Sequence, residues 1–355
     1  MGELTIRRTD APKAKVADES ELGFGKVFTD HMLMMDFNRE KGWHDARIIP
    51  YHDFVLDPAV LVFHYAQAIF EGLKAYKNQK DEIRLFRPKD NFLRMNRSAQ
   101  RLCIPQIDPE EATQNLMELI RVEREWIPTA PDTSLYIRPT IIATEASLGV
   151  KVADSYKFFV ILSPVGPYYE EGIKPVSIYV EDQFVRAMPG GTGDTKAAAN
   201  YATSLISGER AHQKGFSQVL WLDGATHTTV EEVGSMNIFF VIDGELVTPK
   251  LNGSILPGIT RDSILKIARS MGIPTTERTI AIQEIFDAHA NGKLDEVFGT
   301  GTAAVISGVG EMTWKDQAIT INGGKMGKYS QLFYDKLTNI QRGREQDPFG
   351  WVVRV

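Results

Sequence analysis

The sequence predicts a two-domain protein of mixed α/β type, and three observations support this prediction. The chain has 355 residues, more than one hydrophobic core usually serves, because domains commonly hold about 100 to 200 residues. Hydrophobic residues make up 43% of the chain and charged residues 24%, as in globular proteins with a packed interior. Strand-like and helix-like segments are intermixed in both halves, without the strict alternation of a parallel α/β sheet.

The expected helices are marked by capping residues and apolar periodicity. An Asp-Pro pair, a helix cap followed by a first-turn proline, begins two of them at Asp57 and Asp108. Gly72 is expected to end the first of these helices, and Gly215 another one in the second half of the chain. The expected helices cover residues 58–72, 90–102, from 109 onward, 197–214 and 260–271.

The expected strands are short runs of β-branched and aromatic residues separated by turns. Asp243-Gly244, between two such runs, is a strong signal for a two-residue hairpin turn. Tyr136 and Arg138 are two residues apart on another run, so their side chains should project from one face of that strand. The expected strands cover residues 73–76, 83–86, 134–144, 158–162, 176–180, 218–222, 238–242 and 245–247.

A change in composition marks the expected domain boundary. Residues 163–175 carry three prolines, two glycines and a pair of tyrosines directly after a strand. The first twenty residues are polar enough to form a loose arm. We therefore expect a polar arm at 1–20, a smaller domain at 21–165, a linker at 166–176 and a larger domain at 177–355.

Composition excludes several classes of function. Forty Lys and Arg against 46 Asp and Glu give a net charge of -6, so no positive field favours nucleic acid. Cys103 is the single cysteine, which excludes an intrachain disulfide and a thiolate metal cluster. The seven histidines show no metal-ligand spacing, and no zinc-protease or serine-hydrolase motif occurs, so no metal is expected. No segment is typical of a signal peptide or membrane span, which predicts a cytoplasmic protein.

Lys196 is the first candidate for chemistry. It follows a glycine-rich segment at 189–195 that lacks the Gly-Lys-Ser/Thr ending of a phosphate-binding P-loop. Small residues come after it, which leaves room for a flat ligand that a lysine amine could hold as a Schiff base. An ordinary solvated lysine at a helix start is the alternative. Tyr201 is five residues further on, about 500° around a helix, so both can face one ligand only if Lys196 precedes the helix.

Three other segments have ion-binding character. Residues 257–260 lead into an amphipathic helix, whose first N–H groups favour a phosphate, with a plain threonine cap as the alternative. Glu232 precedes an apolar strand, where a buried carboxylate needs a cation such as a pyridinium; a solvated turn glutamate is the alternative. Residues 299–304 fit a relaxed dinucleotide fingerprint, but a strand is expected after them where that fingerprint needs a helix.

Arginines provide two further candidates. Arg94, Arg97 and Arg101 form a basic ridge on one helix, usually a solvated face, of which at most one member is expected to be functional. Tyr136 and Arg138 could be a carboxylate clamp or a hydrogen-bonded core pair.

With these candidates in place, the chain resembles the branched-chain amino acid aminotransferases, pyridoxal-phosphate enzymes of fold type IV. The likeness runs from about Gly23 to the end, and its nine motifs occur in order. They are FGKVFTDHML (24–33), HYAQAIFEGLKAY (64–76), RLFRP (84–88), SLYIRPT (134–140), LSPVGPYY (162–169), GGTGDTKAAANYA (190–202), EEVGSMNIFF (231–240), ILPGITR (255–261) and FGTGTAAV (298–305).

The resemblance implies the fold type IV architecture, with the active site at the domain interface and pyridoxal 5′-phosphate as cofactor. It makes Lys196 the Schiff-base lysine, which also moves the proton of the substrate Cα atom. Tyr201 corresponds to the phenol near the cofactor's O3′, and Glu232 to the partner of the pyridine nitrogen. The implied phosphate holders are Arg94, the backbone of Ile259 and Thr260, and Thr302.

A substrate pocket and a homodimer are implied as well. Arg138 corresponds to the guanidinium that receives the γ-carboxylate of glutamate, and the Thr302-Ala303 backbone to the site of the α-carboxylate. Tyr65 would reach the active site of the neighbouring subunit. Ser235 stands where many relatives have threonine, and the CxxC pair of mammalian members is absent, which excludes a thiol switch there. The other implied pocket residues are Phe24, Phe70, Tyr136, Tyr168 and Ser235.

The implied activity is the reversible, ping-pong transfer of an amino group between L-leucine, L-isoleucine or L-valine and 2-oxoglutarate. A D-amino acid transaminase or an aminodeoxychorismate lyase of the same fold is the alternative, and the stereochemistry of the substrate would separate them. A dinucleotide oxidoreductase, which would bind NADH, and a non-catalytic cofactor-binding module are the alternatives from other classes.

Overall fold

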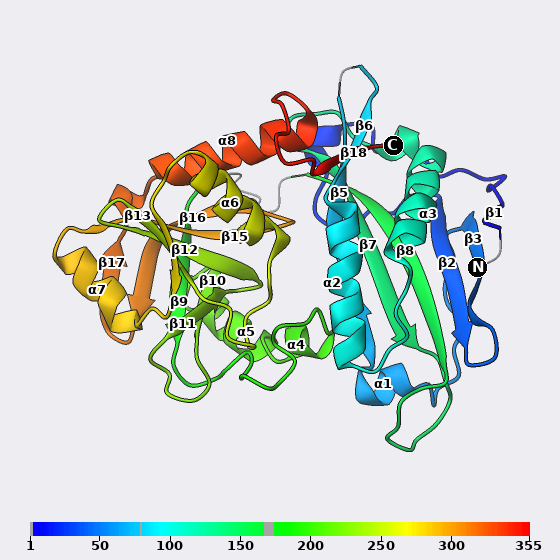
Figure 1. The fold of residues 1–355 in the computed structure, drawn as a ribbon, viewed down its shortest axis with the longest axis horizontal. Helices are drawn as coiled ribbons and strands as arrows, with labels where there is room; N and C mark the ends of the chain where they lie inside the picture. The colour runs from blue at the N-terminus through cyan, green and yellow to red at the C-terminus, as the bar shows by residue number, and fades with distance from the viewer. Residues whose placement is uncertain (1–2, 79, 167–173) are drawn as a thin grey trace. The chain divides into compact units, whose positions relative to one another are not determined.

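The structure is a computed structural model that describes residues 3–78, 80–166 and 174–355. Internal contacts divide the described chain into two compact units (Figure 1). Most of the expected linker, residues 167–173 with Tyr168, lies outside the described residues. Unit 1 comprises the described residues of Met1–Glu170, Thr195–Ala199 and Ile340–Val355, and unit 2 those of Glu171–Asp194 and Asn200–Asn339.

A nine-stranded sheet forms the centre of unit 1. Its order is β1-β3-β2-β8-β7-β5-β6-β18, with β4 paired to β7. Strands β1 and β3 pair in parallel, and the other neighbours are antiparallel. The expected strands at 73–76 and 83–86 are confirmed as β5 and β6, which pair as a hairpin, and those at 134–144 and 158–162 as β7 and β8. The strands are β1 (Thr5–Ile6), β2 (His31–Asn38), β3 (Gly42–Pro50), β4 (Ala68–Phe70), β5 (Leu73–Lys77), β6 (Ile83–Phe86), β7 (Ser134–Ala143), β8 (Ser155–Val165) and β18 (Val352–Arg354).

Two helices cover this sheet. Helices α2 (Pro88–Arg101) and α3 (Pro109–Val122) pack together, and α3 also contacts β2 (Figure 1). Asp108 caps α3, because its carboxylate accepts the N–H groups of Glu110 at 2.8 Å and Glu111 at 3.1 Å. Both expected helices are therefore confirmed, with α2 beginning two residues earlier than expected. Their apolar faces and the inward side chains of β7 and β8 make up the core of unit 1.

The expected helix at 58–72 is wrong in its second half. Helix α1 spans only Leu61–Tyr65 and ends at Ala66, whose φ of 50° lies in the left-handed region. The residues that follow form β4, which pairs with β7 and buries Ile69 completely. Pairing with a strand about seventy residues away decides this segment, and local periodicity contains no information about such a contact. The correction matters because it places Phe70 on a sheet.

Unit 2 contains a second sheet of nine strands, and six of them form a closed ring. The order is β11-β10-β9-β16-β15-β12-β13-β14. Strand β11 also pairs with β12, and this pairing closes the first six strands of that order into a ring. The predicted Asp243-Gly244 hairpin is confirmed between β12 and β13, with positive φ at both turn residues. The strands are β9 (Val176–Glu181), β10 (Gln218–Leu222), β11 (Val230–Val233), β12 (Met236–Ile242), β13 (Glu245–Pro249), β14 (Thr275–Arg278), β15 (Leu294–Gly301), β16 (Val305–Trp314) and β17 (Gln317–Thr320).

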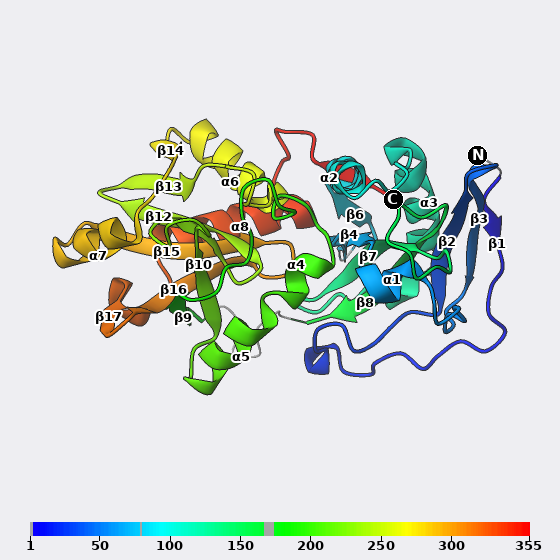
Figure 2. The same ribbon diagram turned by 90° about the horizontal axis from the view of Figure 1, so that it is seen from below.

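The expected single helix at 197–214 is two helices, α4 (Ala199–Ala202) and α5 (Leu205–Gln213). The hydroxyls of Thr203 and Ser204 donate to the carbonyls of Asn200 and Tyr201 at 2.9 and 2.8 Å. These side chains compete with the backbone for the carbonyls, which interrupts the helix. Helix α5 packs against β9 and β10 (Figure 2).

Three further helices lie in the second half of the chain. A buried carboxylate binds the first N–H groups of one of them. Glu296 of β15 accepts the N–H groups of Tyr329 and Ser330 at 2.7 and 2.9 Å, at the start of the last helix. A Cβ atom on Gly327 would lie 2.0 Å from the Glu296 side chain, so glycine is required at this approach. The helices are α6 (Ile259–Ser270), which confirms the expected helix at 260–271, α7 (Ile282–Ala290) and α8 (Lys328–Arg342).

Candidate active site

The backbone of Lys196 is attached to β4 and α2. Its N–H donates to Ser98 Oγ at 2.9 Å, and its carbonyl accepts the N–H of Phe70 at 3.1 Å. The next residue, Ala197, forms an antiparallel bridge with Ile69. Lys196 therefore precedes α4 rather than lying in it, as a ligand shared with Tyr201 requires. The glycine-rich segment before the lysine ends at this fixed point.

Five of the predicted site residues form one contiguous cluster within unit 1. The Lys196 Nζ atom lies 4.6 Å from the centroid of the Phe70 ring, and the Arg138 guanidinium lies 4.7 Å from the same ring. Arg138 also donates to the Tyr136 hydroxyl at 3.1 Å, which confirms that the two side chains share a face. The ring of Phe24 packs edge-on against Tyr136, with centroids 5.0 Å apart. The cluster thus joins an amine, a guanidinium and three aromatic rings.

A glycine provides space for this cluster, and one of its arginine N–H groups is available to a ligand. A Cβ atom on Gly72 would lie 2.2 Å from the Tyr136 hydroxyl, so the glycine permits the position of that phenol. Arg138 Nε is buried and has no hydrogen-bond partner among the described residues. A buried donor without a partner is costly unless a ligand takes it. The aromatic surroundings favour an acidic ligand group at that nitrogen.

Of the three arginines on the α2 ridge, Arg94 alone is buried. Arg97 and Arg101 are exposed, as expected of a solvated face. Arg94 makes a bidentate ion pair with Glu71, with Nε–Oε1 and NH2–Oε2 distances of 2.8 Å each. Glu71 is fully buried, and the sequence interpretation missed it. The pair fixes the plane of the guanidinium, because two parallel hydrogen bonds define its orientation.

Glu232 is a buried carboxylate in unit 2, with 3% of its surface exposed. Its Oε2 atom lies 2.5 Å from Arg186, and its Oε1 atom accepts the side-chain N–H of Asn237 at 3.1 Å. Arg186 also donates to the carbonyls of Gly193, at 3.2 Å, and Ser254. One guanidinium therefore connects two of the motifs and the residue that precedes a third. Sequence reasoning missed Arg186, although the requirement that a buried glutamate has a cationic partner could have prompted a search for it.

The amino-terminal end of α6 adjoins Glu232 and Asn237. Gly258 is the residue before the helix, and no side chain caps this end. A Cβ atom on Gly258 would lie 1.9 Å from Asn237 Oδ1, so a side chain is excluded there. Thr300 pairs with Asn237 in the sheet, and its hydroxyl is buried without a partner among the described residues. The N–H end of a helix, a carboxylate and a hydroxyl are therefore neighbours in unit 2.

Two turns lie at one edge of the same sheet. Ser235 belongs to the turn between β11 and β12, and Thr302 and Ala303 to the turn between β15 and β16. Because Asn237 pairs with Thr300, these turns extend past the same ends of neighbouring strands. Strand β16 follows at once, as the sequence predicts, so the helix of a dinucleotide-binding motif is absent at this position.

Three predicted residues belong to other segments of the chain. Tyr201 lies on α4 in unit 2. Tyr65 is 40% exposed at the end of α1, and its hydroxyl donates to the carbonyl of Leu148. Tyr168 lies outside the described residues, so its place in the site stays a prediction.

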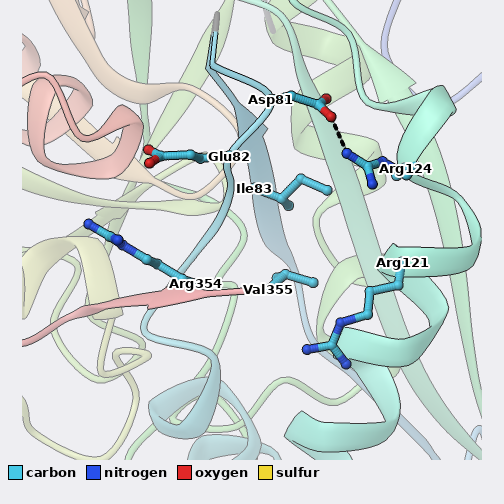
Figure 3. Close-up of a pocket in the computed structure, with 7 residues that line it drawn as sticks. All are labelled: Asp81, Glu82, Ile83, Arg121, Arg124, Arg354 and Val355. Atoms are coloured by element: carbon cyan, nitrogen blue, oxygen red, sulfur yellow. Dashed lines mark hydrogen bonds and ion pairs between the residues drawn. The ribbon is translucent and has the colours of Figure 1, made fainter.

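A surface pocket of about 350 Å³ in unit 1 contains none of the predicted site residues (Figure 3). Arg124 pairs with Asp81 at its rim, and Arg121 pairs with Glu118. In the described part of the chain, no group of three or more His, Cys, Asp or Glu side chains could hold a metal. The helices of that part include none with the length and apolar character needed to cross a bilayer. The pocket is lined by Asp81, Glu82, Ile83, Arg121, Arg124, Arg354 and Val355.

Lys74 of β5 lies beside Tyr136 in the sheet, and its side chain is buried. Burial, with a smaller contribution from the nearby Arg342, lowers the pKa of this ammonium group to about 7, while Asp132 opposes the shift. A lysine with this pKa loses its charge within the physiological range. It therefore links the stability of unit 1 to pH.

Comparison with known proteins identifies the family. Residues 68–312 match the family described as amino-transferase class IV. The chain is 54% identical over 352 residues to branched-chain-amino-acid aminotransferase 2 of Bacillus subtilis (strain 168), with 99% of this chain and 97% of that protein covered. The branched-chain amino acid aminotransferase of Escherichia coli has a similar structure, with a TM-score of 0.76 and 27% identity over 91% of this chain and 98% of that one.

A second solved structure has the same architecture. The branched-chain aminotransferase of the thermophilic archaeon Thermoproteus uzoniensis, crystallised with norvaline, gives a TM-score of 0.76 and 25% identity. The match covers 91% of this chain and 99% of that one. The chain thus belongs to the class IV aminotransferases and has their two-domain, mixed α/β fold of type IV.

Proposed function

We propose that the chain is a branched-chain-amino-acid aminotransferase. It uses pyridoxal 5′-phosphate to move the amino group between L-leucine, L-isoleucine or L-valine and 2-oxoglutarate. The observation that carries this function is the 54% identity over 99% of the chain to a relative of that name. A D-amino acid transaminase and an aminodeoxychorismate lyase share the fold, but identity at this level and coverage does not favour them.

Each unit, taken by itself, contains groups that fit this cofactor. In unit 2 the uncapped N-terminal end of α6 suits a phosphate, and the buried Glu232 carboxylate suits a protonated ring nitrogen. The buried hydroxyl of Thr300 has no partner among the described residues and is a further polar group for a ligand. In unit 1 the backbone of Lys196 is held on β4, with its amine over the Phe70 ring.

Lys196 is the catalytic residue of this proposal. When bound, pyridoxal phosphate supplies a carbonyl group for the amino group and a ring that withdraws electrons from the substrate Cα atom. Lys196 holds the cofactor covalently in the resting enzyme. Its amine would also take the proton from the substrate Cα atom as a base and give it back as an acid. A single lysine therefore serves as covalent anchor, as base and as acid.

The other cofactor-binding residues hold the ring and the phosphate in place. Glu232 keeps the ring nitrogen protonated, since a carboxylate stabilises a neighbouring cation. Tyr201 donates a hydrogen bond to O3′. The phosphate is bound by the remaining residues of the proposed set, which are Arg94, the backbone N–H groups of Ile259 and Thr260, and Thr302.

The unit 1 cluster is the proposed substrate pocket. The rings of Phe24, Phe70 and Tyr136 accept a leucine-like side chain, because apolar contact needs no directed hydrogen bond. Arg138, with its buried Nε, receives the γ-carboxylate of glutamate or 2-oxoglutarate. One pocket then serves both substrates of the ping-pong reaction. Ser235, Tyr168 and the backbone of Ala303 complete the proposed substrate contacts.

We also propose a cytoplasmic homodimer in which Tyr65 reaches the neighbouring active site. Exposed apolar side chains surround this tyrosine. Phe63 is 62% exposed on α1, and Leu148, which accepts the hydrogen bond from Tyr65, is 69% exposed. Val150, two residues further on, is 83% exposed. An apolar surface of this kind supports burial against a second copy of the chain.

The visible absorbance of the purified protein tests this function first. A yellow protein that loses its colour with L-leucine in the absence of any oxo acid, and keeps it with D-alanine, supports cofactor, half-reaction and stereochemistry together. A protein that stays colourless after incubation with pyridoxal phosphate contradicts the proposal. Loss of colour with D-alanine alone would favour the D-amino acid transaminase.

A further inference from the structure

The N-terminal arm, residues 3–23, follows the outside of unit 1 in an extended path (Figure 2). Its short strand β1 pairs in parallel with β3. Further along, the N–H of Thr9 donates to His31 Nε2 at 2.8 Å, and the N–H of Lys13 donates to Asp30 Oδ1 at 2.8 Å. Two backbone N–H groups of the arm are therefore bound by two buried side chains at the start of β2.

The bond from Thr9 determines the protonation state of His31. A backbone N–H can only donate, so Nε2 must carry a lone pair and the ring proton must lie on Nδ1. Nδ1 in turn contacts the carboxylate of Glu123, at the end of α3. The same carboxylate accepts the N–H of Asp30 at 3.1 Å. His31 is thus a neutral ring that donates to a buried carboxylate and accepts from the arm.

Charged groups face His31 from several segments. Glu123 and Asp30 are both buried, and Asp30 also accepts the indole N–H of Trp126 at 2.8 Å. On the arm, two lysines face this cluster: Lys13, with its Nζ 2.9 Å from the carbonyl of Thr29, and Lys15, with its Nζ 5.8 Å from the centroid of the Trp126 ring. Burial raises the pKa of Glu123, and the hydrogen bond from His31 opposes that rise. Two buried carboxylates therefore lie beside a ring whose Nε2 accepts the hydrogen bond from Thr9.

The arm leads directly to the proposed substrate pocket. The Glu19 carboxylate accepts the N–H groups of Thr129 and Ala130 at 2.8 and 2.7 Å. The carbonyl of Gly23 then accepts the N–H of Gly166 at 3.3 Å. The next residue is Phe24, whose ring packs against Tyr136. The arm is thus a strap with successive attachments to unit 1, and it ends at a side chain of the pocket.

We propose that His31 is a positioning residue: its unprotonated Nε2 fastens the arm through Thr9, and protonation of the ring in acid releases the arm and loosens Phe24 over Tyr136. A protonated ring directs an N–H at the N–H of Thr9, so the two groups can no longer bond. Histidine is the side chain that ordinarily takes up its proton between about pH 8 and pH 5. The effect on Phe24 rests on the proposed function, whereas the release of the arm does not.

Hydrogen exchange of the arm, measured by mass spectrometry at about pH 8 and pH 5.5 and corrected for intrinsic exchange rates, tests the release. The protection of Thr9 should fall about fivefold in acid, the size expected for one hydrogen bond. His31→Gln places a carbonyl oxygen near the position of Nε2 and does not titrate, so its protection should not depend on pH. His31→Asn keeps a donor toward Glu123 and has no acceptor for Thr9, so its protection should be low at both values.

Two further variants keep the test decisive. Thr9→Pro removes the N–H donor and leaves the buried cluster intact, so the arm should be released at both pH values even if a His31 variant folds poorly. His44→Gln is the matched control, because the ring of His44 on β3 bonds to the carbonyl of Gly42 in its own turn. This control should keep the acid release of the wild type. Acid release that persists in His31→Gln, or its absence from the wild type, overturns the proposal.

The effect on the pocket is measured separately. In acid, the KM of the wild type for L-leucine should rise relative to that of His31→Gln at the same pH, by about twofold to fivefold, with the ratio of the kcat values unchanged. Equal KM values in both proteins would overturn the link to Phe24. A protein that does not turn over L-leucine contradicts the proposed function, and the exchange experiment still decides whether His31 fastens the arm.

Discussion

The carboxylate of Glu232 lies 2.5 Å from the guanidinium of Arg186, and both side chains are buried. The same guanidinium contacts the carbonyls of Gly193 and Ser254, so it joins the strand of the proposed pyridine partner to a second motif and to the residue before a third. A carboxylate buried this deeply is stable only with a cation beside it. The structure thus contains a ready counter-charge for Glu232 within unit 2.

Arg186→Met should therefore destabilise the protein by about 3 to 5 kcal/mol, the cost of leaving one member of a buried ion pair alone. Arg186→Lys is the matched control, because it keeps the charge and should retain part of the stability. Chemical denaturation of the cofactor-free protein measures both changes. Unchanged stability in Arg186→Met would show that the pair has no structural importance.

Lys196→Ala should leave the fold intact and abolish turnover. The side chain is half-buried and contacts the face of Phe70, so its removal should cost less than about 1 kcal/mol of stability. The covalent attachment of the cofactor should be lost, which the visible spectrum and the mass of the reduced protein report. Lys214→Ala is the control, since Lys214 is exposed at the end of α5. Turnover retained in Lys196→Ala would refute the proposed role of this lysine.

Arg138→Met should separate the two substrates. The KM for 2-oxoglutarate should rise about 10-fold to 100-fold, because a bidentate guanidinium–carboxylate contact is lost. The KM for L-leucine should change little, because the Met side chain keeps the pocket apolar. Arg97→Met, which changes an exposed arginine on α2, should alter neither value. Steady-state kinetics with each substrate varied in turn measures the difference, and an equal rise in both KM values would argue against Arg138 as the acidic subsite.

Lys74→Met should stabilise the protein at neutral and lower pH. The folded pKa of about 7 lies below the ordinary lysine value of 10.5, so between these values the folded state binds fewer protons than the unfolded chain. The stability of the wild type should therefore rise with pH across this window. Below about pH 7 both states are charged, and the variant should gain the most there, on the order of a few kcal/mol. Urea denaturation at several pH values checks this, and a gain that increased with pH would contradict the sign.

Phe63→Glu should weaken the proposed homodimer. A charge on an exposed apolar side chain of α1 costs an isolated subunit little, but burying it against a partner is costly. Analytical ultracentrifugation should then show monomers at concentrations where the wild type is dimeric. Leu93→Glu, which changes an exposed apolar residue on α2, is the control and should leave the dimer intact. A wild type that sediments as a monomer would refute the homodimer itself.

Local sequence signals predicted most elements of the fold. Asp-Pro at 108–109 and Asp-Gly at 243–244 produce a helix start and a hairpin turn because they act on their own backbone. The helix expected at 58–72 failed where β4 pairs with β7, and the one at 197–214 failed where two hydroxyls bind helix carbonyls. The first of these predictions failed because the conformation of the segment is decided by pairing with a strand far away in the sequence. The second failed because the interruption of the helix is decided by side-chain rotamers that the sequence does not specify.

The candidate site divides in the same way. The sequence by itself determined the family and the shared face of Tyr136 and Arg138, because motif order and strand periodicity are properties of the chain. It named Lys196 and Glu232 as candidates and left open whether the Glu232 carboxylate is buried, which the structure shows it to be. Only the tertiary structure decided the partners, since Glu71 for Arg94, Arg186 for Glu232 and Thr9 for His31 are 22 to 46 residues away along the chain. Such pairs form because folding buries each charged or polar group and requires a complementary one beside it, wherever the chain supplies it.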